Sequence, residues 1–163
     1  METTAELAGF FAAHAIWCVS DGEPLIPMLA YLKPDGERGM DRIALDNFEE
    51  AVAAGQQWLA ENKHDAAGAV LLYDAYVTLE SGKTDALVLE ARQYDAAPRS
   101  FQMIVPYRNA QAPDGFAVHR PKLVSVTGYD DPPFDAIADA FFRGVDSHEK
   151  GAEVWSAYLD ESR

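Results

Sequence analysis

Residues 69–94 read AVLLYDAYVTLESGKTDALVLEARQY and decide the fold class of this chain. Side chains of the two faces alternate in both halves, and one face is strongly apolar, as in strands that bury one side. The segment Ser81–Thr84 separates the halves and contains glycine, which is typical of a turn between antiparallel strands. We therefore predict a β-hairpin with strands at 69–80 and 85–94.

Similar patterns on both sides of the hairpin predict the remaining elements. Downstream, 101–107 and 116–126 continue the hairpin as an antiparallel meander of four strands. Upstream, 25–32 and 40–45 are predicted as two shorter strands, and Pro27 confines the first to a sheet edge or a strand start. Helical spacing of apolar residues predicts four helices, at about 4–19, 46–62, 132–144 and 147–159.

The order of these elements, α-β-β-α-β-β-β-β-α-α, predicts a single α+β domain over residues 1–163. We expect a mainly antiparallel sheet of about five to six strands, with helices packed mostly on one face. Small ligand-sensing domains and the acidic dimeric chaperones of secretion systems are similar to this layout. That likeness holds at the level of the fold only, because no sequence motif supports it.

Charge is distributed unevenly along the chain. The formal net charge is −14, yet the segment 92–122 carries five cations against two anions. Nucleic acids are held largely by Lys and Arg, and a strongly acidic protein repels phosphate backbones and anionic lipid surfaces. We therefore expect neither nucleic acid nor a membrane as a partner, whereas a basic protein segment is compatible with the charge.

The basic segment supplies the candidate binding residues. If the last strand is regular, Arg120 and Lys122 point to the same face, and Arg108 at the end of the preceding strand lies close to them. The complete candidate ligand- or partner-binding set is Arg92, Tyr94, Tyr107, Arg108, Arg120 and Lys122. A second explanation stays open, in which these cations neutralise acidic groups on neighbouring elements or on a second subunit.

No motif predicts a catalytic residue, a metal site or a cofactor. His14 and Cys18 share one helical face at a spacing that would allow a thiolate–imidazole pair. Their apolar neighbours favour core packing instead, where a thiol is inert. The acidic residues between 130 and 139 are better explained by helix capping than by a cation site. No signal peptide or membrane helix is recognised, so we expect a cytoplasmic protein.

Two classes of function remain. We predict a non-catalytic protein-interaction domain of bacterial type that is homodimeric and binds a partner as secretion chaperones or immunity proteins do. The nearly uncharged first helix motivates the dimer. The alternative is a small-molecule or anion-binding domain, or a small enzyme, with a pocket between sheet and helices. That pocket would be lined by Tyr73, Tyr76, Tyr94 and Tyr107, beside Arg92 and Arg108.

Overall fold

The computed structural model describes residues 1–162 of the 163-residue chain. Along the sequence, its helices and strands are α1 (Glu2–Val19), β1 (Met28–Leu32), β2 (Arg38–Arg42), α2 (Phe48–Glu61), β3 (Gly68–Leu79), β4 (Gly82–Gln93), β5 (Arg99–Arg108), β6 (Ala117–Val118), β7 (Lys122–Thr127), α3 (Phe134–Ser147) and α4 (Glu149–Ala157). The α+β class and the antiparallel sheet predicted from the sequence are confirmed.

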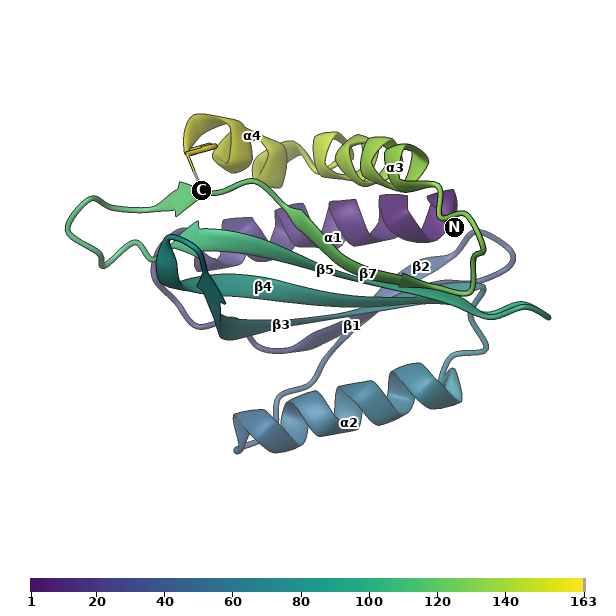
Figure 1. The fold of residues 1–163 in the computed structure, drawn as a ribbon. Coiled ribbons are helices and arrows are strands. Elements are labelled where there is room, and N and C mark those ends of the chain that lie inside the picture. The colour runs from purple at the N-terminus through teal and green to yellow at the C-terminus, as the bar shows by residue number, and fades with distance from the viewer. Residues whose placement is uncertain (163) are drawn as a thin grey trace.

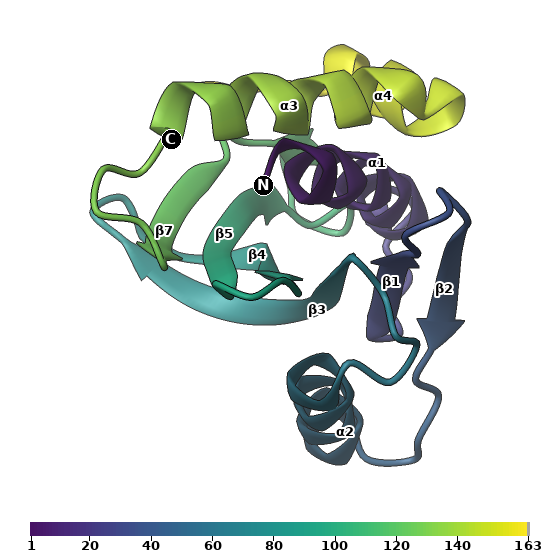
Figure 2. The same ribbon diagram turned by 90° about the vertical axis from the view of Figure 1, so that its right-hand side faces the viewer.

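The sheet has seven strands in the order β2-β1-β3-β4-β5-β6, and β7 pairs with β5 beyond the end of β6. Every pairing between these strands is antiparallel. Helices α1, α3 and α4 cover one face of the sheet, and α2 lies alone on the other (Figure 1). Seen from the side, the sheet is strongly curved, and its concave face holds α1 beneath α3 (Figure 2). Helices packed mostly on one face were therefore predicted correctly.

The two faces of the sheet bury separate cores. The larger core lies between the sheet and the layer of α1, α3 and α4. It includes Leu72, Leu89 and Phe141, which are fully buried. The smaller core lies under α2 and includes Leu71 and Leu59. Alternation along β3 explains this division, because Leu71 and Leu72 are adjacent and must face opposite sides.

Helix α1 is central because most of its residues are apolar, and its alanines and glycine let neighbouring elements approach closely. It packs against α3, α4 and the strands β1, β3 and β4. Eleven of its eighteen residues are buried, including Ala8, Ala12 and Ala15. The nearly uncharged surface that motivated a dimer is thus covered largely by elements of the same chain.

The predicted last strand, 116–126, is divided in two. Ala117–Val118 forms β6, and pairing with β5 resumes only at Lys122. Pro121 lies in the break and has no N–H to donate to a strand neighbour. At the break, the residues 158–161, here called the C-terminal segment, run parallel to Val118 through an isolated bridge to Leu159.

Within the described part of the chain, no helix has the length and apolar character needed to cross a bilayer.

Candidate functional site

The six residues predicted to bind a ligand or partner lie in separate places. Arg92 and Tyr94 lie at the end of β4 that is nearest to the end of α2. The Tyr94 hydroxyl donates a hydrogen bond to the Leu59 carbonyl, and burial raises the pKa of Tyr94 to about 12. Lys122 begins β7 opposite Ile104 of β5. Tyr94 therefore anchors α2 to the sheet rather than facing the other candidates.

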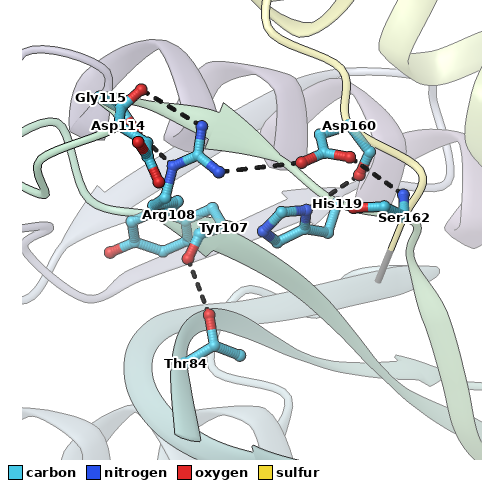
Figure 3. Close-up of polar contacts among 8 residues, drawn as sticks. All are labelled: Thr84, Tyr107, Arg108, Asp114, Gly115, His119, Asp160 and Ser162. Atoms are coloured by element: carbon cyan, nitrogen blue, oxygen red, sulfur yellow. Dashed lines mark hydrogen bonds and ion pairs between the residues drawn. The ribbon is translucent and has the colours of Figure 1, made fainter. Parts of the chain in front are cut away.

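Arg108 and Arg120 lie beside the acids of the C-terminal segment. Figure 3 shows Arg108 between Gly115 and Asp160. The Arg108 guanidinium donates from Nε to the Gly115 carbonyl at 2.7 Å, and its Nη1 lies 3.8 Å from Asp160 Oδ2. Arg120 Nη2 lies 3.0 Å from Glu161 Oε2. For these two arginines, acids of the same chain provide the neighbouring negative charge.

Tyr107 points toward a different part of the sheet. It lies on the same face of the sheet as Asp85, its partner on β4. Its hydroxyl donates to the Asp74 carboxylate, with both oxygens at 2.8 Å. Its backbone carbonyl accepts from Thr84 Oγ1 at 3.0 Å (Figure 3). Tyr107 is 1% exposed, so this arrangement is held firmly by packing.

A cavity of about 700 Å³ opens beside Tyr107, between α2, β3 and the α1–β1 connection. Four consecutive β3 residues, from Tyr73 to Tyr76, line it. Since neighbouring residues of a strand face opposite sides of the sheet, the cavity must reach around the edge of β3. The full lining is Gly22, Glu23, Pro24, Leu25, Phe48, Glu49, Val52, Ala53, Gln56, Tyr73, Asp74, Ala75, Tyr76, Asp85, Tyr107 and Asn109.

The charge of this lining is entirely negative. It includes Glu23, Glu49, Asp74 and Asp85, and it includes no lysine, arginine or histidine. We call this cavity the acidic cleft. Its remaining surface is largely apolar or aromatic, with Phe48 being 45% exposed. Carboxylates set among aromatic rings suit a cationic group that also carries apolar surface.

Two carboxyl groups of the cleft are poorly compensated. Burial raises the pKa of Asp74, and the negative charge of Asp85 raises it further, although the hydrogen bond from Tyr107 acts in the opposite direction. Burial also raises the pKa of Asp85. An opposite charge brought within a few ångströms favours the ionised form of such groups. A cation that enters the cleft would therefore be stabilised by the ionised carboxylates of both Asp74 and Asp85.

A third carboxylate near the cleft already has partners. Glu90 Oε2 accepts a hydrogen bond from the Tyr73 hydroxyl at 2.7 Å and another from Gln56 Nε2 at 3.0 Å. Burial, strengthened by the Glu90 contact, raises the pKa of Tyr73 well above its usual range. This network fixes the orientation of Tyr73 and links α2 to β4, so it shapes the wall of the cleft.

The pair His14 and Cys18 does not form the contact that a thiol enzyme needs. His14 Nδ1 lies 3.1 Å from His148 Nε2 and forms its hydrogen bond there. Burial raises the pKa of the Cys18 thiol, which keeps it protonated and unreactive. Across residues 1–162, no three His, Cys, Asp or Glu side chains gather closely enough to hold a metal ion.

No protein-family model, curated protein or solved structure matches this chain.

Sequence reasoning named part of this cleft but missed its acids. Tyr73, Tyr76 and Tyr107, proposed as linings of a pocket, do line it, whereas Tyr94 and the arginines Arg92 and Arg108 do not. A signal for Asp74 was present, because it continues the apolar face of Val70 and Leu72 along β3. No comparable pattern marked Glu23 or Glu49, because they line the cleft only through the path of the folded chain.

Proposed function

We propose that this protein is a non-catalytic interaction domain of bacterial type whose acidic cleft binds a basic segment of a partner protein. The observation that supports it is a cavity with four carboxylates and no cation in its lining. Electrostatic complementarity of this kind directs association and selects the partner. The apolar wall from Phe48 and Val52 suits a protein segment, whose basic residues are interspersed with apolar ones.

A binding assay with variants tests this proposal. The probe is a fluorescein-labelled peptide of alternating lysine and valine, and its anisotropy is followed at low and at physiological salt. Asp74→Asn and Asp85→Asn each remove one charge while preserving shape, and we expect each to weaken binding by about three- to tenfold. Asp139→Asn, on the exposed face of α3, is the matched control and should bind as the wild type does. Equal affinity of all four proteins would refute the proposal.

The same cleft favours a second candidate function, a site for a small organic cation. Its volume of about 700 Å³ falls within the roughly 300–1,000 Å³ of typical small-molecule sites, and three tyrosines line it. A small anion, the ligand considered at first, does not suit four carboxylates. Displacement of the labelled peptide by agmatine at far lower concentrations than by unlabelled peptide would favour this second candidate.

A homodimer and a cytoplasmic location are further parts of the proposal. Because α1 packs within its own chain, a dimer would have to use another surface. Sedimentation at micromolar concentration tests it, and a single species at the monomer mass of 17.9 kDa would argue against it.

A further inference from the structure

We propose that the partner segment binds as an added β-strand along the free edge of β3, from Tyr73 to Leu79, with basic and apolar residues in alternation. This inference rests on the proposed function, since it specifies how the acidic cleft holds its partner. Strand addition supplies affinity through backbone hydrogen bonds and specificity through alternate side chains.

The edge of β3 is open because β1 is too short to cover it. Twelve residues of β3 pair with β4, from Gly68 to Leu79. On its other side β3 pairs with β1 only as far as Leu72, opposite Met28. In the part of the chain that is described, the remaining β3 residues have no backbone hydrogen bond to any other segment on that side. The open edge of seven residues is about 23 Å long, enough for a strand of ordinary length.

Pairing of β3 with β1 stops at Met28, the first residue of β1. Pro27 precedes Met28 directly, and the N–H that this proline lacks would have faced β2, because the N–H and the carbonyl of a strand residue point to the same edge. Its carbonyl accepts from the Ile43 amide at 2.8 Å, on the side of β2. The chain before it, including Pro24, forms a wall of the cleft. The preceding chain therefore borders the open edge of β3 without pairing with it.

The two faces of the open edge differ in chemistry. Asp74 and Tyr76 lie on one face, together with Asp85, the direct partner of Tyr76 on β4. Tyr76 is 79% exposed and available for contact. Tyr73 and Ala75 lie on the other face, toward α2. An added strand would thus place alternate side chains near Asp74 and Asp85, where lysine or arginine fits.

The intervening side chains of the added strand would face α2. There Phe48 and Val52 present apolar surface to the cleft, and Phe48 is 45% exposed. An apolar side chain at every second position would bury against them. The sequence pattern recognised is therefore an extended segment in which basic and apolar residues alternate over about five to seven positions.

The other free edges suit such a segment less well. Strand β2 carries Arg38 and Arg42, and β7 begins with Lys122, so both would repel a basic strand. The edge of β6 is bridged by Leu159 of the C-terminal segment. A second copy of this chain is a poor occupant of the β3 edge, because it would bring the same carboxylates together.

The experiment compares peptides that differ only in backbone donors. One version of the lysine–valine peptide is N-methylated at its lysines and another at its valines. Alternate residues of a strand direct their N–H groups to opposite edges. We expect one methylated peptide to lose at least about tenfold in affinity and the other to stay within about threefold. In hydrogen exchange, alternate amides between Tyr73 and Leu79 should become protected when the unmodified peptide binds.

A variant of the protein tests whether the peptide binds at the open edge of β3. Tyr76→Lys adds a positive charge at a position that is 79% exposed, so the fold should tolerate it, and binding should weaken by at least about fivefold. Val124→Lys on β7, at a position 55% exposed, is the matched control and should bind normally.

The outcomes separate this inference from the proposed function. Equal affinity of the two methylated peptides, with binding still reduced by Asp74→Asn, would refute strand addition and leave the basic-partner proposal intact. Absence of binding by any lysine–valine peptide would refute both. Unchanged binding by Tyr76→Lys would place the peptide elsewhere and overturn the inference.

Discussion

His148 illustrates how a single side chain joins two helices. Its Nδ1 accepts a hydrogen bond from the Gly151 amide at 2.9 Å and so caps α4. The neutral ring must then carry its proton on Nε2, which donates to His14 Nδ1. By the same reasoning His14 carries its proton on Nε2, a buried atom for which no partner is recorded among the described residues. The pair is therefore compatible only with two neutral rings.

The first prediction concerns the pH dependence of this pair. Burial lowers the pKa of both His14 and His148 from the ordinary value of 6.5. Below about pH 6.5 the unfolded chain takes up protons more readily than the folded one, so stability is complete above that pH and falls as the pH decreases. His148→Asn keeps a capping group but cannot titrate. Chemical denaturation at pH 7 and pH 5 should show that the free energy of unfolding decreases less for this variant than for the wild type.

An equal loss of stability in the wild type and in His148→Asn would assign the pH dependence to other groups. His148→Ala provides the control for capping, since it removes both the titration and the hydrogen bond. It should cost about 1 kcal/mol at pH 7.

The second prediction concerns Asp85, whose charge is costly to the free protein. Because burial raises the pKa of Asp85 in the folded state, the unfolded chain ionises more readily. Stability is therefore lost as the pH rises from the pKa of the unfolded chain to that of the folded protein. Asp85→Asn should therefore raise the free energy of unfolding at pH 7, by about 0.5 kcal/mol. The gain should vanish near pH 3, where both states are protonated. Thermal unfolding at the two pH values measures it, and a loss of stability at pH 7 would contradict the prediction.

At the scale of elements, α1 and α3 are held unusually close by glycine. A Cβ at Gly144 would lie 1.9 Å from the Glu6 carbonyl oxygen, and one at Gly9 would lie 1.8 Å from that of Phe141. The sequence-based expectation that α3 stops at Gly144 is wrong, because the helix continues to Ser147. Glycine serves here for close approach of two backbones rather than for helix termination.

The third prediction uses this contact. Alanine is the better helix former by about 0.5–1 kcal/mol, so Gly144→Ala would stabilise an isolated helix. In the folded protein the added methyl group must push α1 away, and we expect a net loss of about 2–3 kcal/mol. Urea denaturation followed by circular dichroism measures it. Ala138→Gly on the exposed face of α3 is the control, with an expected loss of about 1 kcal/mol. Stabilisation by Gly144→Ala would show that the two helices separate easily.

At the scale of the whole molecule, the C-terminal segment closes the structure over β6. The Val118 amide donates to the Tyr158 carbonyl at 2.9 Å, and the Asp160 amide donates to the Val118 carbonyl at 2.8 Å. His119 beneath it is 0% exposed and bonds through Nδ1 to the Asp160 carbonyl at 2.9 Å. The segment thus shields a buried polar ring, and the Asp160 carbonyl, which can only accept, requires a proton on His119 Nδ1.

The fourth prediction tests this closure. Asp160→Pro removes both the amide donor and the carboxylate, whereas Asp160→Ala removes only the carboxylate. The Asp160 side chain is partly exposed and its ion pair with Arg108 is long, so Asp160→Ala should leave the exchange of the Val118 amide nearly unchanged. Asp160→Pro should release the segment and speed hydrogen exchange at the Val118 amide. Equal exchange in the two variants would show that the backbone bond at Asp160 does not hold the segment.

Local patterns predicted the elements well because alternation and helical spacing report which side of an element is buried. The end of α2 illustrates this success, since the expected stop at Asn62 is its C-cap residue with φ of 53°. Its start was expected at residue 46, whereas Asn47 provides the cap and the helix begins at Phe48. The undivided strand 116–126 was also wrong, because Pro121 and the C-terminal segment act there together.

The sequence by itself determined the hairpin of residues 69–94, the α+β class and the negative charge of the molecule, since each depends on neighbouring residues or on composition. Only the tertiary structure decided which groups meet. Tyr107 reaches Asp74 across 33 positions of sequence, Arg108 lies beside Asp160, and β1 leaves part of β3 open. These outcomes depend on strand length, strand order and packing between distant elements, which periodicity along the chain does not encode. The acidic cleft exists for that reason, and the lysine and arginine residues of the basic segment lie outside its lining.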